Sequence, residues 1–352
     1  MKMKKILLNT ILPIVITFLI GAIIITLTGD NPLSTYYQMI SKALFDTTGL
    51  LRTFHVAAPL ILTGLAIAIS FKANIFNMGV EGQAVLGGFS AAIVGSYLHI
   101  SNPAVHILVC MVVAIIIGML TALIPAILKA YYNVNEIVVT LMLNYIIVEL
   151  LTFLSEGVFK DPSPVGYVST PKIQDTAMIN KIGLGDLTLF TFAAIFIAVL
   201  VFILMKKTKL GYEINAIGYN QEFSEATGVS VRKKIIIIML ISGAISGIAG
   251  AGWMLSEKFR YSAQFSGSPG LGWDGMLISL LGGNSPVGVV IAAIFYSVLK
   301  VGMSKIELFT SVPKEIVSII QALMVLLLAV KYYKKGFFGV VRKKLKKERS
   351  EA

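Results

Sequence analysis

Long apolar runs recur along this chain, and they constrain its fold more than any other feature. Two of them, Leu187–Met205 and Ile235–Leu255, each approach the roughly 20 apolar residues needed to cross the hydrocarbon core of a bilayer. The composition agrees, because 56% of the 352 residues are hydrophobic and only 14% are charged, whereas about a quarter of the residues of a soluble domain are charged. The sequence therefore predicts an all-α polytopic membrane protein.

About ten transmembrane helices are predicted, and some of them are short or broken. Besides the two runs above, spans are predicted at Ile6–Thr28, Phe54–Phe71, a stretch that ends at Leu98, Ala104–Leu128, Glu136–Ser155 and Glu315–Val330. The remaining apolar segments, Gly272–Gly282 and Pro286–Leu299, are either two spans or one broken hairpin. We expect residues 1–352 to form a single transmembrane domain.

The distribution of cations predicts the orientation. Two thirds of the 30 Lys and Arg residues lie in segments assigned to the inside, chiefly the segment 206–234 and the basic tail 331–352. By the positive-inside rule, both termini are then cytoplasmic, and the segments 29–53, 156–186 and 256–271 face outward. The net charge of +12 is explained in this way without a nucleic-acid partner, and no motif that reads RNA or DNA accompanies it.

The basic segment 206–234 is predicted to be a cytoplasmic docking loop. Its six cations cluster at its two ends, whereas its middle is of mixed composition. Asn220 can cap a short helix over Asn220–Ala226, and the carboxylates of Glu222 and Glu225 suit the positive end of that helix. Gly218 and Gly228 are expected to permit tight turns on either side. The alternative is a solvated linker that its lysines hold at the membrane surface.

A polar interruption at Ala73–Gly88, ANIFNMGVEGQAVLGG, is a candidate wall of a substrate pathway. Non-helical backbone at membrane depth is tolerated only where it is buried in protein or lines a cavity. The side chains of Asn74, Asn77, Glu81 and Gln83 supply groups that could hydrogen-bond a ribose or a purine edge. The alternative is an inside turn at which these residues meet water or helix ends.

Two other segments are candidates for the same pathway. In Asn135–Ile146 the polar residues, including Asn144, recur every three to four residues and can share one face of a helix; the alternative is a helix capped by Asn135 in which Asn144 joins spans. In Ser266–Gly288 the glycines indicate a broken pair of helices with Trp273 as a stacking surface for a planar base. Close helix packing is the alternative there.

No catalytic group or metal site is predicted. His55, His99 and His106 lack metal-ligand spacing and are expected at membrane interfaces, and the single Cys110 is expected to be a small buried hydrophobe. The phosphate-binding pattern G-x-x-x-x-G-K-[ST] is absent, so we expect this chain not to hydrolyse ATP itself.

Two patterns carry a family resemblance. The pattern G-Y-E-x-x-A-x-G-x-N-x-E-x-x-x-x-x-G-V at Gly211–Val229 and the phrase F-N-x-G-x-E-G-Q at Phe76–Gln83 resemble those of permease subunits of ABC importers of the ribose and nucleoside type. Asn135–Ile146 is similar to the same subgroup.

This resemblance implies a multi-pass protein of the bacterial plasma membrane that takes up nucleosides and binds no cofactor itself. It further implies a cytoplasmic ATPase that holds ATP and Mg, a second permease that is the same or a related chain, and an extracytoplasmic substrate-binding protein. The resemblance also places the ATPase-coupling helix in the loop 206–234.

Two alternatives are a permease for a ribose-type sugar and a secondary transporter or channel that needs no partner. Few acidic residues lie at mid-span positions, so the chain offers few groups for a proton or sodium relay, and this argues against the secondary transporter.

Overall fold

The computed structural model describes residues 12–27, 29–163, 167–183, 185–263, 269–306, 319 and 323. The described residues form helices and no strand beyond one isolated bridge between Lys181 and Thr188. The predicted span Glu315–Val330 and the basic tail lie outside the described residues, apart from two isolated positions.

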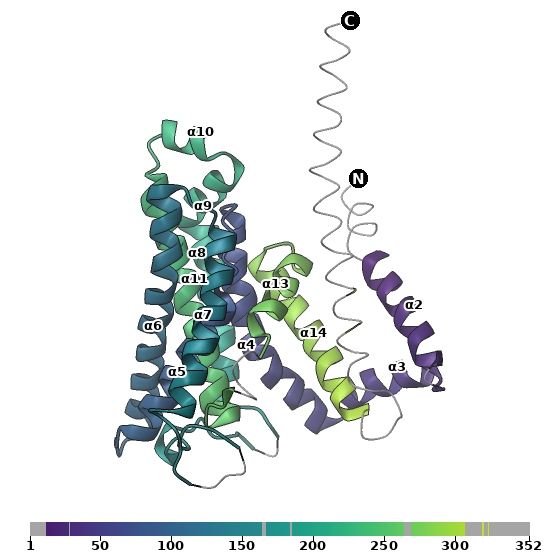
Figure 1. The fold of residues 1–352 in the computed structure, drawn as a ribbon. Helices are drawn as coiled ribbons and strands as arrows, with labels where there is room; N and C mark the ends of the chain where they lie inside the picture. The colour runs from purple at the N-terminus through teal and green to yellow at the C-terminus, as the bar shows by residue number, and fades with distance from the viewer. Residues whose placement is uncertain are drawn as a thin grey trace, which may run out of the picture. The chain divides into compact units, whose positions relative to one another are not determined.

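Figure 1 shows the helices in chain order. They are α2 (Leu12–Leu27), α3 (Pro32–Ile40), η2 (Ser41–Phe45), α4 (Thr47–Lys72), α5 (Val80–Tyr97), α6 (Pro103–Tyr132), α7 (Glu136–Glu156), η3 (Asp175–Ala177), α8 (Leu189–Lys207), α9 (Lys209–Tyr219), α10 (Gln221–Ala226), α11 (Val231–Trp253), η4 (Met254–Lys258), α13 (Leu271–Leu281) and α14 (Pro286–Ile306). The segment 29–53, which was predicted to be an outside loop, is largely helical.

Five of the described helices are long and apolar enough to cross a membrane, namely α4, α6, α7, α8 and α11 continued by η4. A sixth span results if α2 and the helical segment Pro32–Phe45 count as one bent pair. The all-α membrane architecture is confirmed. The count of about ten and the cytoplasmic termini stay predictions.

Local chemistry fixes several helix starts. Asn102 precedes Pro103, and its side chain accepts hydrogen bonds from the N–H groups of the first turn of α6. Asn135 caps α7 in the same way through Ile137 N–H at 3.0 Å. An amide oxygen at this position satisfies N–H groups that have no partner inside the helix.

The chain divides into two compact units, and the boundaries fall inside α4 and α14. The smaller unit comprises residues 1–50 and 298–352. Within it, Tyr36 donates a hydrogen bond to the carbonyl of Phe18 at 2.8 Å, and Lys305 Nζ lies 2.8 Å from Asp46 Oδ2.

The larger unit, residues 51–297, is a helix bundle in which α5 packs between α6, α7, α11 and α13. Small residues bring α5 and α11 together: a Cβ atom on Gly87 would lie 2.8 Å from Gly247 Cα. Because lipid offers no hydrophobic gain between helices, such close backbone contact is a main source of their attraction.

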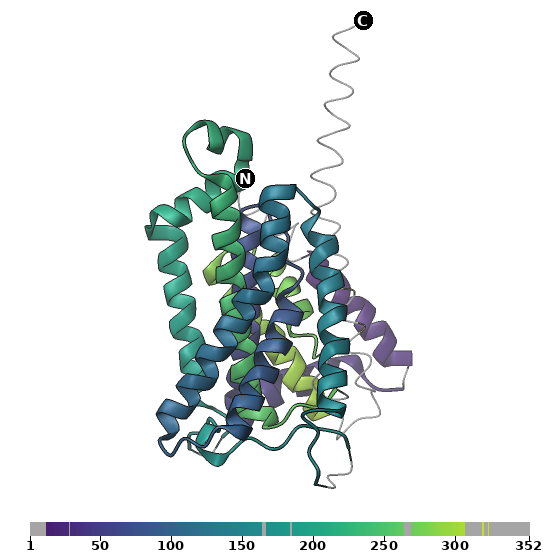
Figure 2. The ribbon, with the colours of Figure 1, turned by 60° about the vertical axis from the view of Figure 1, so that its left-hand side comes forward.

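The two ends of this bundle differ. Helices α9 and α10 lie at one end, and the segment 157–188 lies at the other (Figures 1 and 2). Backbone hydrogen bonds hold its described residues against η4 and the residues that follow η4: Thr170 N–H donates to Tyr261 O at 2.8 Å, and Ile179 N–H donates to Leu255 O at 2.9 Å. The described part of this segment is therefore a structured connection.

The first prediction tests whether these two ends face opposite sides of the membrane. In a background in which Cys110 is replaced by Ser, we expect Ser163→Cys to react with an impermeant maleimide added outside intact cells, because Ser163 is exposed in the 157–188 segment. We expect Glu222→Cys on α10 to react only after the cells are opened. Labelling of both positions from the same side would contradict the predicted topology.

Candidate functional site

The turn between α4 and α5 and the first turn of α5 together carry four of the predicted pathway residues, but the structure separates one of them. Asn74 is the second residue after the end of α4, has a φ of 58° and is exposed. Asparagine tolerates this left-handed conformation better than most residues. Asn74 therefore shapes the turn and lies apart from the buried cluster that its neighbours form.

That cluster joins the amides of Asn77 and Gln83 to the hydroxyl of Ser242. The two amides exchange hydrogen bonds at 3.2 Å, and Asn77 Nδ2 also donates to Ser242 Oγ at 2.9 Å. Ser242 in turn donates to the carbonyl of Ala66 at 2.8 Å. All three side chains are fully buried. The cluster therefore links α4, α5 and α11 through groups that would be costly to bury without partners.

Asn144 completes the start of α5 from a different helix. The capping position of α5 is Gly79, which has no side chain to offer. Asn144 Oδ1 on α7 accepts from Gly82 N–H at 3.0 Å, and its Nδ2 donates to Met78 O at 2.8 Å. The predicted polar face of Asn135–Ile146 is thus turned toward the bundle interior, where it supplies a cap in trans.

Glu81 on α5 supplies a cap for the start of α13 in the same way. Its carboxylate accepts from Gly270 N–H at 2.8 Å and from Gly272 N–H at 2.5 Å, and only 3% of its surface is exposed. A Cβ on Gly272 would clash with the backbone of Glu81, so this close approach requires glycine. The positive end of the α13 dipole adds to the attraction for a carboxylate.

Four of the predicted pathway residues therefore gather around the start of α5, namely Asn77, Glu81, Gln83 and Asn144. Trp273 lies in the first turn of α13 and is 43% exposed. Because it directly follows Gly272, the hydrogen bond between Gly272 and Glu81 also holds the backbone of Trp273 in place. Sequence reasoning missed Ser242. A hydroxyl within the apolar run Ile235–Leu255 was the available signal.

The predicted docking loop contains two short helices, α9 and α10. Thr208 caps α9 by accepting from Gly211 N–H at 3.2 Å, and Asn220 caps α10 by accepting from Phe223 N–H at 2.9 Å. The short helix capped by Asn220 is confirmed, whereas α9 was not predicted. The expectation of a tight turn at Gly218 was wrong, because Gly218 lies within α9.

The structure nevertheless explains why glycine is suited to positions 218 and 228. A Cβ on Gly218 would overlap the carbonyl of Lys72, so α9 packs directly on the end of α4. Gly228 has a φ of 88° and forms the turn after α10 that was expected there.

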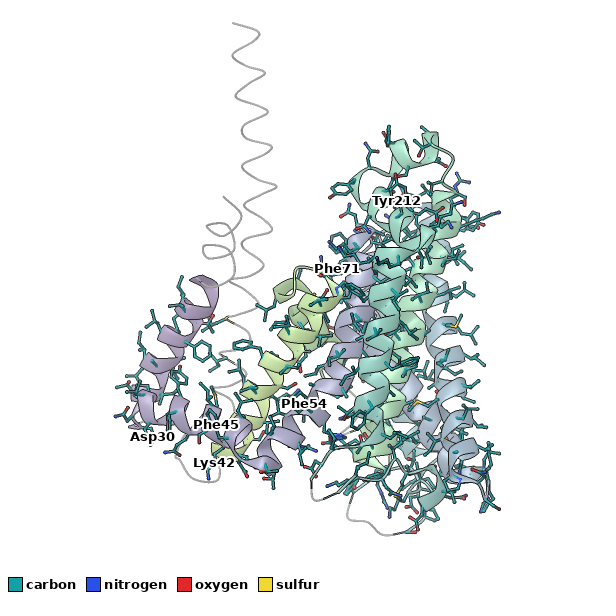
Figure 3. All side chains as sticks on the ribbon, turned by 180° about the vertical axis from the view of Figure 1, so that it is seen from behind. Asp30, Lys42, Phe45, Phe54, Phe71 and Tyr212 are labelled. Carbon is teal, nitrogen blue, oxygen red and sulfur yellow. The ribbon has the colours of Figure 1, made fainter. Side chains whose placement is uncertain are left out.

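Helices α9 and α10 present an exposed aromatic surface. A groove of about 260 Å³ is lined by Tyr212, Asn215, Ala216, Tyr219, Asn220 and Phe223. Tyr219 is 91% exposed and Phe223 is 67% exposed, and Glu222 and Glu225 are exposed beside them. Figure 3 labels Tyr212 at this end of the bundle, beyond Phe71 in the last turn of α4. Large exposed rings of this kind are typical of protein contacts.

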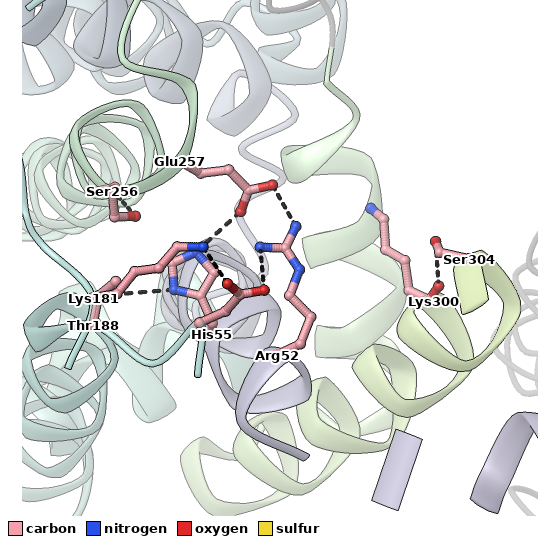
Figure 4. A network of polar contacts seen from close by, with 10 residues as sticks. Arg52, His55, Lys181, Thr188, Ser256, Glu257, Lys300 and Ser304 are labelled. Carbon is pink, nitrogen blue, oxygen red and sulfur yellow. Dashed lines mark hydrogen bonds and ion pairs between the residues drawn. The ribbon is translucent and has the colours of Figure 1, made fainter. Parts of the chain in front are cut away.

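A polar network lies near the opposite end of the bundle (Figure 4). Glu257 accepts from Arg52 at 2.6 Å and from His55 Nε2 at 3.1 Å, while His55 Nδ1 lies 3.2 Å from Thr188 Oγ1. Lys181 and Arg52 both pair with Asp186. The hydrogen bond from Lys181 and the charge of Arg52 hold the pKa of Asp186 below its ordinary value. His55 and His106 are both buried within the protein, and their predicted position at a membrane interface stays a prediction.

Residues 49–329 match the family described as the permease component of branched-chain amino acid transport systems. This chain belongs to that permease family. The prediction of a transport subunit in a multi-pass membrane protein is thereby confirmed.

Similar curated proteins include the guanosine ABC transporter permease NupP of Bacillus subtilis, 34% identical over 96% of this chain and 97% of that protein. The nucleoside ABC transporter permease NupB of Lactococcus lactis is 33% identical over 94% and 92%. The glucose ABC transporter permease TsgB13 of Haloferax volcanii is 31% identical over 94% and 89%. No solved structure matches the chain significantly.

The second prediction concerns the contact between Glu81 and α13. We expect Glu81→Ala to lower the free energy of unfolding by about 1–3 kcal/mol, because the buried N–H of Gly272 and the part-buried N–H of Gly270 lose their acceptor. Glu81→Gln retains one acceptor oxygen and should cost less. Thermal unfolding of the purified protein in detergent measures both, and Glu225→Ala on the exposed face of α10 is the control. Equal stability of Glu81→Ala and Glu225→Ala would contradict the capping role.

Proposed function

We propose that this chain is the membrane permease of an ABC importer that takes up nucleosides across the bacterial plasma membrane. The observation that carries the proposal is the match of 33–34% identity, over nearly the whole chain, to two permeases named for guanosine and nucleosides. The energy comes from ATP and Mg held by a separate cytoplasmic ATPase. A second permease, the same or a related chain, and an extracytoplasmic binding protein complete the complex.

The polar groups around the start of α5 support a pathway for a polar solute. They combine amide, hydroxyl and carboxylate groups inside a bundle whose core is mainly apolar. Trp273 adds a half-exposed aromatic face next to Gly272, whose N–H donates to Glu81. Nucleosides carry both a planar base and several hydroxyl groups, so they require both kinds of contact. In the closed bundle the polar groups satisfy one another, and a substrate pathway requires some of these hydrogen bonds to open.

The groove on α9 and α10 supports docking of the ATPase. It lies at the end of the bundle where the basic segment 206–234 was predicted to be cytoplasmic. Gly218, Asn220 and Gly228 shape the two helices, and Glu222 and Glu225 provide exposed charge for the partner. We assign the ATPase-coupling role to this surface.

A sugar permease is the second candidate, because the glucose permease of Haloferax volcanii is 31% identical over 94% of this chain. A sugar shares the hydroxyl groups of a nucleoside but lacks the base. The choice between the two therefore depends on whether a base is needed for transport.

The third prediction separates these two candidates. In proteoliposomes that contain the chain, its ATPase, the second permease and the binding protein, we expect guanosine to stimulate ATP hydrolysis severalfold. We expect ribose and glucose at the same concentration to have no effect, because neither offers a base. Stimulation by glucose but not by guanosine would reject the nucleoside assignment in favour of a sugar permease.

The fourth prediction concerns the docking surface. We expect the double variant Tyr219→Ala and Phe223→Ala to weaken binding of the ATPase at least tenfold, since exposed aromatic residues commonly dominate the energy of an interface. Phe196→Ala is the matched control, because Phe196 is similarly exposed but lies in the middle of α8. Co-purification and titration of the ATPase measure the effect. Unchanged binding in the double variant would transfer the docking role to Tyr131–Asn135 or to the basic tail.

A further inference from the structure

Helix α9 is joined to the bundle by a buried ion pair. Glu213 on α9 places Oε2 2.6 Å from Nζ of Lys234 on α11, and the two side chains are only 8% and 21% exposed. Glu213 is the acidic residue of the G-Y-E pattern at Gly211–Val229. Its burial separates it from Glu222 and Glu225, which are exposed on α10. Glu213 therefore faces the bundle, away from the docking surface.

This pair opposes separation of α9 from the start of α11. A carboxylate buried without its cation is strongly unfavourable, so separation of the two helices would expose or strand a charge. Helix α10 follows α9 after Asn220, whose side chain and carbonyl both bond into α10. A displacement imposed on α10 thus reaches α11 through α9.

Helix α11 carries the displacement to the amide cluster. Ser242 lies eight residues after Lys234, which corresponds to about 12 Å along an α-helix. It accepts the hydrogen bond of Asn77 and donates to Ala66 O. The same helix therefore holds the ion pair at one position and the polar cluster two turns further on.

A second connection runs from α9 to Asn77. Gly218 of α9 packs against Lys72 O and Ala73 Cα, and Ala73 begins the turn that contains Asn77. Asn77 is thus reached from α9 along the α4–α5 turn and also through α11. Two routes that converge on one buried amide constrain its position more tightly than either route alone.

We propose that the Glu213–Lys234 ion pair is the joint that transmits ATPase-driven movement of α9 and α10 to the cluster of Asn77, Gln83 and Ser242. Glu213 and Lys234 are positioning residues, because they act on the pathway through α11. This inference rests on the proposed function. It assigns a role to two residues that belong neither to the predicted pathway nor to the docking surface.

The test measures coupling separately from assembly. Lys234→Met removes the cation and keeps much of the side-chain volume. In proteoliposomes with the complete complex, we expect this variant to retain the ATPase and to hydrolyse ATP. We expect guanosine uptake per ATP hydrolysed to fall at least fivefold.

A control is available in the pair of Arg260, which follows η4, and Asp161, which lies in the 157–188 segment. Its atoms are 3.6 Å apart and its side chains are 19% and 11% exposed, and it lies at the end of the bundle opposite α9 and α10 (Figures 1 and 2). Arg260→Met should therefore keep the ratio of uptake to hydrolysis within twofold of the wild-type value. The exchanged pair Glu213→Lys with Lys234→Glu should recover much of the ratio that Lys234→Met loses.

Several outcomes would overturn the inference. They are a wild-type ratio in Lys234→Met, or an equal fall in Arg260→Met. If Lys234→Met fails to assemble, Ser242→Ala breaks the other end of the route and must lower the same ratio; an unchanged ratio there also rejects the joint. Absence of uptake by the wild-type complex would instead reject the proposed function, and the inference with it.

Discussion

The structure of the larger unit depends on one constraint: a helix that begins inside an apolar bundle must find partners for its first N–H groups within the protein. Helices α5 and α13 both begin in this way, and neither has a side-chain cap of its own. Asn144 supplies the partner for α5, and Glu81 supplies it for α13. The contact of Glu81 fixes where the short helix α13 and its Trp273 lie relative to α5, and the contact of Asn144 fixes α5 against α7.

Helix α11 connects the remaining features of the unit. It packs on α5 and α6 through glycine and other small residues, so its backbone cannot shift without disturbing both neighbours. It also bears Lys234 at the end near α9 and Ser242 within the buried cluster. One rigid element thus spans the distance between the exposed aromatic groove and the polar groups of the proposed pathway.

Several local features were predictable because they depend on neighbouring residues. Asn135 and Asn220 cap the helices that follow them, and a side chain that bonds its own backbone needs no tertiary structure to do so. Helix α9 escaped prediction because its glycines suggested a loop, while its buried face of Ile214 and Ile217 is too short to give a clear period. The burial of His55 and His106 depends on distant partners such as Thr188 and Thr176.

The sequence by itself determined that the chain is an α-helical membrane protein, and its motifs indicated the permease family, because runs of apolar residues and short motifs are properties of contiguous residues. Only the tertiary structure decided that Asn77, Gln83 and Ser242 share hydrogen bonds, that Glu81 caps α13 and that Glu213 pairs with Lys234. The partners of Ser242 and Glu81 lie far from them along the chain. Their association follows from helix packing, which the periodicity of one segment cannot specify.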